Sequence, residues 1–215
     1  MNLTNKFKLS SIALASVMAM GAMPTVASAD VEYSASIATM NLFRGTDASQ
    51  GAAMSGDMKY SNSGFYVGGW TVSGLQGDTT AGSGAGYELD LFAGYSGEVA
   101  GIGYDVSYWD VDYPQIKGEK SYTEADLSLS FKDFSFLYAI GMNSGAKNSY
   151  MTLGYSMDKV SVTYGMSKDE ANKYSHIDLS YAATDKLTYT VSKATDDGAG
   201  VNEEMKIVLS YALPI

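Results

Sequence analysis

The charged residues that could do chemistry in this chain occur mostly as pairs two positions apart. The pairs are Asp57 with Lys59, Glu88 with Asp90, Glu124 with Asp126, and His176 with Asp178. Side chains two positions apart on an extended strand point to the same side, so both members of a pair face one surface. Rings of acidic side chains on such a surface favour cations. The spacing therefore predicts an acidic surface that is carried on strands.

The elements that must position these pairs are short strands, because apolar and polar residues alternate from Val31 to the C-terminus. In residues 87–93, Tyr, Leu, Leu and Ala occupy one face, and Glu, Asp and Phe occupy the other. A period of two residues is typical of a strand with one apolar and one polar face. The pattern predicts twelve strands, at residues 31–43, 52–60, 65–73, 86–96, 101–110, 122–131, 134–142, 149–157, 160–167, 174–183, 187–194 and 204–213.

The connections between these strands alternate in length. The tight ones, rich in the turn formers Ser, Asn, Asp and Gly, lie at 61–64, 97–100, 132–133, 158–159 and 184–186. The longer and polar ones lie at 44–51, 74–85, 111–121, 143–148, 168–173 and 195–203. Short periplasmic turns and longer external loops are the layout of an outer-membrane barrel. The sequence thus predicts an all-β, transmembrane, antiparallel up-and-down β-barrel of about twelve strands in the bacterial outer membrane.

Aromatic residues cluster near the predicted strand ends. Tyr60, Tyr95, Phe131, Phe134, Tyr155 and Tyr181 lie beside short turns, and Trp70, Tyr87, Tyr108, Tyr122, Tyr150 and Tyr174 lie towards the long loops. Aromatic rings with a polar end suit the membrane interface, where two girdles anchor a barrel. We therefore expect two girdles, the alternative being that tyrosine is simply frequent in strands.

The N-terminal segment has the pattern of a secretory signal peptide. Residues 1–29 contain two lysines, an apolar stretch at 9–22, and Ala27-Ser28-Ala29 as a small-residue cleavage site. We expect residues 1–29 to be removed and residues 30–215 to form the barrel. The chain has no cysteine and a formal net charge of −10, which argues against thiolate metal sites and against nucleic acid as a partner. We expect no metal site and no cofactor.

Several stretches resemble a known family of exported proteobacterial proteins. They are Asn41-Leu42-Phe43-Arg44-Gly45, residues 64–70 and residues 88–97, followed by Tyr104-Asp105 and Tyr113-Pro114. Over residues 31–135 they are similar to the TorF-like porins. The resemblance implies an outer-membrane barrel that acts as a porin. The chain departs from outer-membrane barrels at residues 211–215, which lack the usual terminal aromatic residue that helps the assembly machinery recognise the last strand.

Polar side chains that face the inside of the barrel form the candidate site. By the phase of each strand they are Asp57, Lys59, Glu88, Asp90, Asp105, Glu124, Asp126, His176 and Asp178, with Arg44 where the first strand enters its loop. The carboxylates at 88–126 form an acidic arc, with Arg44 and Lys59 on the other side. Two interpretations stay open. The arc either lines a narrow lumen for small cations or zwitterions, or pairs with charges across the lumen and closes it.

Two functional hypotheses follow. One is a porin that allows passive diffusion of small hydrophilic solutes through a narrow acidic lumen. The other is a non-conducting barrel with a structural, adhesive or partner-binding role through its external loops. Catalysis is not expected, because the chain has one histidine and its neighbour Asp178 fits a structural hydrogen-bonded pair better than a nucleophile system. The expected partners are outer-membrane lipid, lipopolysaccharide, the barrel-assembly machinery and small hydrophilic solutes.

Overall fold

The computed structural model describes residues 29–49, 51–75, 86–116, 121–142, 148–168, 173–196 and 200–215. Its strands are β1 (Asp30–Ala38), β2 (Leu42–Phe43), β3 (Thr46–Asp47), β4 (Ala53–Asn62), β5 (Phe65–Leu75), β6 (Gly86–Val99), β7 (Ile102–Asp112), β8 (Tyr122–Phe131), β9 (Phe134–Gly141), β10 (Ser149–Met157), β11 (Val160–Lys168), β12 (Lys173–Ala182), β13 (Leu187–Asp196) and β14 (Lys206–Ala212). Nearly all of the predicted signal peptide and parts of the predicted long loops lie outside the described residues.

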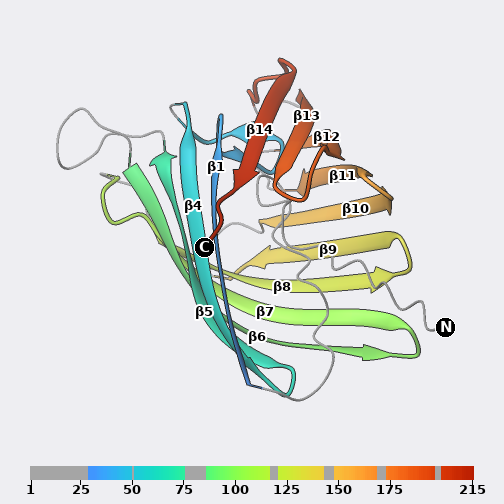
Figure 1. Ribbon diagram of the computed structural model, residues 1–215. Helices are drawn as coiled ribbons and strands as arrows, with labels where there is room; N and C mark the ends of the chain where they lie inside the picture. Colours follow the sequence, from blue (N-terminus) through green and yellow to red (C-terminus); the bar gives the residue numbers. More distant parts are fainter. Residues whose placement is uncertain are drawn as a thin grey trace.

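Twelve of these strands form one closed antiparallel barrel, in the order β1-β14-β13-β12-β11-β10-β9-β8-β7-β6-β5-β4 (Figure 1). From β4 to β14, each strand pairs with the strand that follows it in the sequence. β1 closes the barrel by pairing with both β4 and β14. The predicted all-β antiparallel barrel is confirmed. The predicted strands at 122–131 and 149–157 agree with β8 and β10 at both ends.

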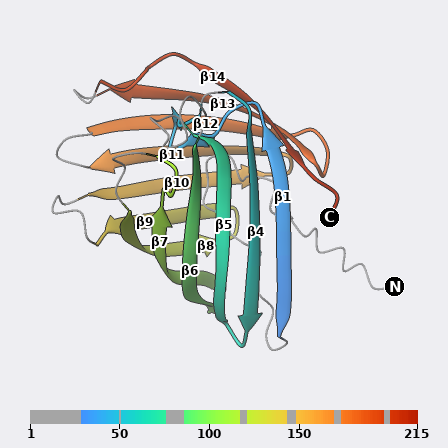
Figure 2. The same ribbon diagram turned by 90° about the vertical axis from the view of Figure 1, so that its left-hand side faces the viewer.

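The closing seam between β1 and β14 is short. β1 pairs with β4 along its whole length, from Asp30 to Ala38, and the two strands lie side by side in Figure 2. With β14 it pairs only from Ser36 to Ala38. Neighbours joined by a tight turn pair over longer stretches. In the turn between β4 and β5, for example, Ser63 and Gly64 have φ of 53° and 88°, and such paired positive values match the twist of a hairpin.

The outer surface of the barrel is apolar and the inner surface is polar, as the alternation predicts. Leu91, Met58 and Leu153 point outward and are about 60% exposed, whereas neighbours one residue away in the strand, such as Asp90, are buried. At the end with short turns the outward aromatic rings pack in pairs, with 4.7 Å between the ring centroids of Phe65 and Tyr95. The six aromatic residues predicted for this girdle are all exposed.

The predicted girdle at the long-loop end is partly wrong. Tyr108 is exposed on the outer surface, but four of the predicted residues lie on the inward phase of their strands: Trp70, Tyr122, Tyr150 and Tyr174. Proximity to a strand end does not determine the face of a residue, whereas its position in the two-residue period does. These four rings therefore belong to the lumen.

The first predicted strand is also corrected. A continuous strand at 31–43 was expected, followed by an external loop at 44–51, but β1 ends at Ala38. The chain then leaves the barrel wall and forms the hairpin of β2 and β3, with Leu42 paired to Asp47. Leu42 is only 1% exposed, because this hairpin folds into the barrel instead of away from it. Among the described residues no helix is long and apolar enough to cross a membrane.

Candidate functional site in the barrel lumen

The centre of the candidate site is the hairpin of β2 and β3, residues 42–47, which we call the lumen hairpin. Its two turn residues are Arg44 and Gly45, with φ of 50° and 78°. Its base is closed by the backbone N–H of Ala48, which donates to the carbonyl of Asn41 over 2.9 Å. Ser49 forms an antiparallel bridge with Leu75 at the end of β5, so the segment after the hairpin is attached to the barrel wall.

Arg44 carries the tip of the hairpin to the opposite wall. Its Nη2 donates to Oε1 of Glu124 on β8 over 2.6 Å, and the two side chains are 16% and 5% exposed. Its Cζ lies 4.8 Å from the ring centre of Phe43 and 4.5 Å from that of Tyr150 on β10. Burial opposes the charge, but the interactions with Glu124, Tyr122 and Tyr150 together more than offset this, and the pKa of Arg44 is raised. Arg44 therefore makes a charge-assisted, ring-flanked contact.

Gly45 fits against a buried histidine on β12. A Cβ atom at Gly45 would lie 2.3 Å from Cγ of His176, and one at Gly165 on β11 would lie 2.0 Å from its Nε2. No side chain larger than hydrogen fits at either place without movement. The imidazole of His176, which is 1% exposed, is thus held between the hairpin and the wall.

Both nitrogens of His176 have partners. Nε2 lies 2.7 Å from the hydroxyl of Tyr150, and Nδ1 lies 3.0 Å from Oδ1 of Asp178. The rings of Tyr150 and His176 are parallel to within 3°. Because Tyr150 also lies against Arg44, one chain of contacts leads from Asp178 to Glu124 through the hairpin tip. The predicted structural pair of His176 and Asp178 is present in the structure.

Four carboxyl groups on β6 and β8 form what we call the acidic cluster: Glu88, Asp90, Glu124 and Asp126. Each of these residues is at most 9% exposed. Glu124 forms a salt bridge with Arg44, while Oδ1 of Asp90 and Oδ1 of Asp126 have no hydrogen-bond partner within the described part of the chain. Tyr113, just beyond β7, forms a hydrogen bond with Glu88, and burial raises the pKa of Tyr113. Its phenol thus stays protonated beside Glu88.

The remaining predicted residues lie nearer the short-turn end, in a second group. Nζ of Lys59 is 2.8 Å from Oε2 of Glu32, and Asp57 accepts a hydrogen bond from Ser34. The hydroxyl of Tyr66 donates to Asp105 over 2.7 Å. Lys59 therefore pairs with Glu32 on its own side of the barrel and not with the acidic cluster, while Asp105, the other carboxylate of the predicted arc, is close enough to interact with Lys59 electrostatically.

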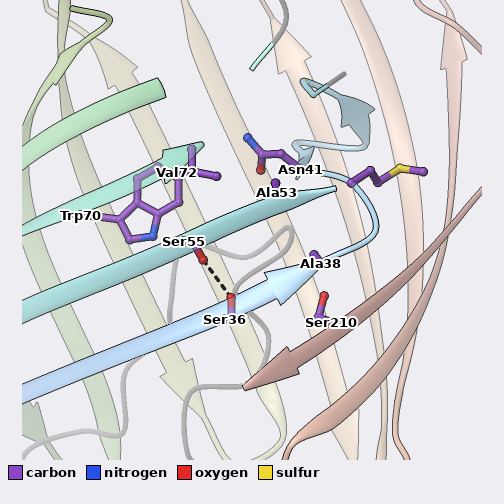
Figure 3. A pocket seen from close by; sticks show the side chains of 9 residues that line it. Ser36, Ala38, Asn41, Ala53, Ser55, Trp70, Val72 and Ser210 are labelled. Atoms are coloured by element: carbon purple, nitrogen blue, oxygen red, sulfur yellow. Dashed lines mark hydrogen bonds between the residues drawn. The ribbon is translucent and has the colours of Figure 1, made fainter. Parts of the chain in front are cut away.

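A small cavity lies beside the base of the lumen hairpin (Figure 3), with a volume of ≈ 10 Å³. Its lining combines hydroxyls with small apolar groups, from Ser36, Ala38, Met40, Asn41, Ala53, Ser55, Trp70, Val72 and Ser210. Ser36 and Ser55 face each other in it at 2.8 Å between their hydroxyl oxygens. This volume is about what a single water needs, so the hairpin base leaves no room for a larger molecule there.

Sequence reasoning placed the inward carboxylates and His176 on the correct face but missed the residues that join them. These are the hairpin tip, with Gly45, and the inward ring of Tyr150. A signal for the hairpin was present in the sequence. Arg44 and Gly45 lie between the strand formers Phe43 and Thr46, and a residue followed by glycine in this position is the pattern of a two-residue hairpin turn. The contact of that turn with β12 has no sequence signal.

One comparison with known proteins gives a match. A family described as "Bacterial protein of unknown function (Gcw_chp)" matches residues 22–204. The comparison with curated proteins gives no match. The family match attaches no activity to the site, and the resemblance to TorF-like porins stays a resemblance.

Proposed function

This chain belongs to the Gcw_chp family of bacterial proteins, whose function is unknown, and we propose that it is an outer-membrane pore for small hydrophilic solutes, constricted by the lumen hairpin. The observation that carries the proposal is the division of the barrel into an apolar outside and a charged, hydroxyl-rich inside. In a membrane, each backbone polar group must be satisfied within the protein, which a closed barrel achieves. A signal peptide would export the chain, and the barrel-assembly machinery would insert it among lipid and lipopolysaccharide.

The inner charges support a preference for cations. Besides Arg44, which bonds Glu124, and Lys59, which bonds Glu32, the inner surface carries further carboxylates, and acidic linings favour cations in pores. The lumen hairpin supports a gated rather than a permanently open pathway, because its tip reaches from the β1 side to β8 and β12. The proposal therefore combines the two interpretations that the sequence left open.

Planar-bilayer recording tests this function with the full barrel and Arg44→Ala. We expect rare, small, cation-preferring events for the unaltered protein. Breaking a charge-assisted bond worth about 1.5–3 kcal/mol should raise the open probability by at least about tenfold. The matched control Lys159→Ala removes a positive charge from an exposed short turn and should change nothing.

Two outcomes would contradict the proposal. Absence of channel events in both proteins would favour the non-conducting barrel, whose role would then lie in its external loops. A clear anion preference would show that the acidic lining does not control the pathway. No enzymatic activity is proposed, since both nitrogens of His176 are engaged by Tyr150 and Asp178.

A further inference from the structure

Arg44 is surrounded as a bound organic cation would be. Glu124 accepts a hydrogen bond from one end of the guanidinium, and the rings of Phe43 and Tyr150 have their centres 4.8 Å and 4.5 Å from its Cζ. A carboxylate combined with flanking rings is the usual recognition of guanidinium and ammonium groups. Phe43 belongs to the hairpin itself, whereas Glu124 and Tyr150 belong to the barrel wall.

The acidic cluster has more acceptors than Arg44 uses. Asp90 and Asp126 are 2% and 5% exposed, and each has an Oδ1 atom without a hydrogen-bond partner among the described residues. Both are close enough to Glu124 to interact with it electrostatically. Buried acceptors without partners are unusual in folded proteins. The wall therefore offers N–H donors a site that the hairpin fills only in part.

The arrangement suits an organic cation better than a metal ion. In the part of the chain that the structure describes, no three His, Asp or Glu side chains are placed to hold a metal ion together. A guanidinium or ammonium group instead donates several N–H bonds that diverge, at the longer distances of hydrogen bonds. Such a group can engage carboxyl oxygens that do not converge on one point.

We propose that the wall residues around Arg44 form a binding site for solutes that carry a guanidinium or primary ammonium group, and that Arg44 occupies this site as an internal competitor. The inference rests on the proposed pore and names its solute class. A solute that enters the site does so only when the lumen hairpin has left, so its binding shifts the population towards the open lumen. The same solute would then open the pore and pass through it.

Equilibrium binding to the folded barrel in detergent micelles tests this directly, with L-arginine as probe and L-citrulline as its uncharged counterpart. Arg44→Ala removes the competitor, and we expect it to bind L-arginine at least about tenfold more tightly than the unaltered protein, the factor that corresponds to 1.4 kcal/mol. Adding Glu124→Gln to Arg44→Ala should weaken that binding by at least the same factor. The control Asp185→Asn, in an exposed short turn, should leave it unchanged.

Equal affinity of Arg44→Ala and the unaltered protein, or equal binding of arginine and citrulline, would overturn the inference. If Arg44→Ala does not fold, Thr46→Cys reports on the hairpin, since the chain has no cysteine of its own. Arginine should then raise the labelling rate of the introduced thiol at least about tenfold, which is the factor expected for the change in affinity. An unchanged labelling rate would overturn the inference.

The binding experiment and the bilayer experiment test the two proposals independently. Binding in micelles needs no conduction, so binding of arginine without channel events would contradict the proposed pore alone. Channel events without binding of arginine would contradict this site alone.

Discussion

At the scale of single residues, the fit between the lumen hairpin and the wall depends on two glycines and one histidine. His176 lies between Gly45 and Gly165, and a Cβ atom at either glycine would overlap the imidazole. In a close-packed interior, a small increase in the volume of one residue displaces its neighbours. The hairpin tip is therefore held by shape as well as by the salt bridge of Arg44.

Gly45→Ala should displace the hairpin. Alanine at a φ of +78° costs about 1–2 kcal/mol, and its Cβ would also meet His176. We expect thiol labelling of the Thr46→Cys reporter to become at least about tenfold faster in this variant. Gly200→Ala is the matched control, because Gly200 has a φ of +73° but nothing within 4 Å of its Cβ position. Equal acceleration by both variants would show that backbone strain, not the histidine contact, is responsible.

Tyr150→Phe tests the hydrogen bond that orients His176. Removing the hydroxyl leaves Nε2 buried without its partner at 2.7 Å, and an unsatisfied buried polar group costs about 1–3 kcal/mol. We expect the free energy of unfolding in urea to fall by about that amount. Tyr164→Phe, on the outer surface of β11, should change it by no more than a few tenths of a kcal/mol. A loss in the control as large as in Tyr150→Phe would contradict this role.

At the scale of elements, the short seam has two causes: β1 turns into the lumen after Ala38, and β14 ends at Ala212. β1 stops pairing with β14 where its chain turns into the lumen, after the N–H of Thr39 donates to the carbonyl of Leu209. β1 therefore gives up part of its contact with the wall so that β2 and β3 can enter. The seam pairs only at residues 36–38 of β1, whereas β6 and β7 pair from Leu89–Asp112 to Val99–Ile102.

The seam should be the first part of the wall to open. Fewer ladder hydrogen bonds mean a lower free energy of local opening. We expect the amides of Thr39 and Leu213, which donate across the seam to the carbonyls of Leu209 and Ala35, to exchange with deuterium at least about tenfold faster than those in the middle of β6 and β7. A disulfide between Ser36→Cys and Ala212→Cys, which pair directly across the seam, should remove the difference. Uniform exchange around the barrel would refute the weak seam.

At the scale of the whole molecule, the outer surface determines where the barrel can reside. Large apolar side chains are exposed on strands all around it, from Val31 on β1 to Leu209 on β14. A patch of this extent is far beyond what soluble monomers expose. Surrounded by lipid, the same surface requires no partner, which is why the apolar outside supports a membrane location.

Leu91→Lys tests that location. Leu91 points outward from the middle of β6 and is 60% exposed, and a lysine on the lipid face costs about 2–4 kcal/mol near the bilayer midplane. We expect the free energy of folding into lipid vesicles to weaken by that amount. Asp133→Lys places the same charge in a short turn and should have little effect. If Leu91→Lys folds into vesicles as well as the control does, the surface does not face lipid.

The sequence by itself determined the phase of the strands and most of their positions, although the first strand ends at Ala38 and not at residue 43. The two-residue period repeats along every strand, and it is a local property that needs no knowledge of the neighbours. It therefore placed Glu88, Asp90 and the other inward carboxylates on the inner surface correctly, together with His176. It failed for Trp70 and Tyr150, where closeness to a strand end was used in place of phase.

Only the tertiary structure decided what fills the lumen. The contacts of Arg44 with Glu124, and of Gly45 with His176, join residues 80 or more positions apart. Such contacts depend on how far the barrel wall curves and on which loop finds space inside it, and no local pattern encodes either. Alternation along the chain is a property of each strand, whereas occupation of the lumen is a property of the closed barrel. The sequence could therefore identify the acidic wall but not which segment of the chain lies against it.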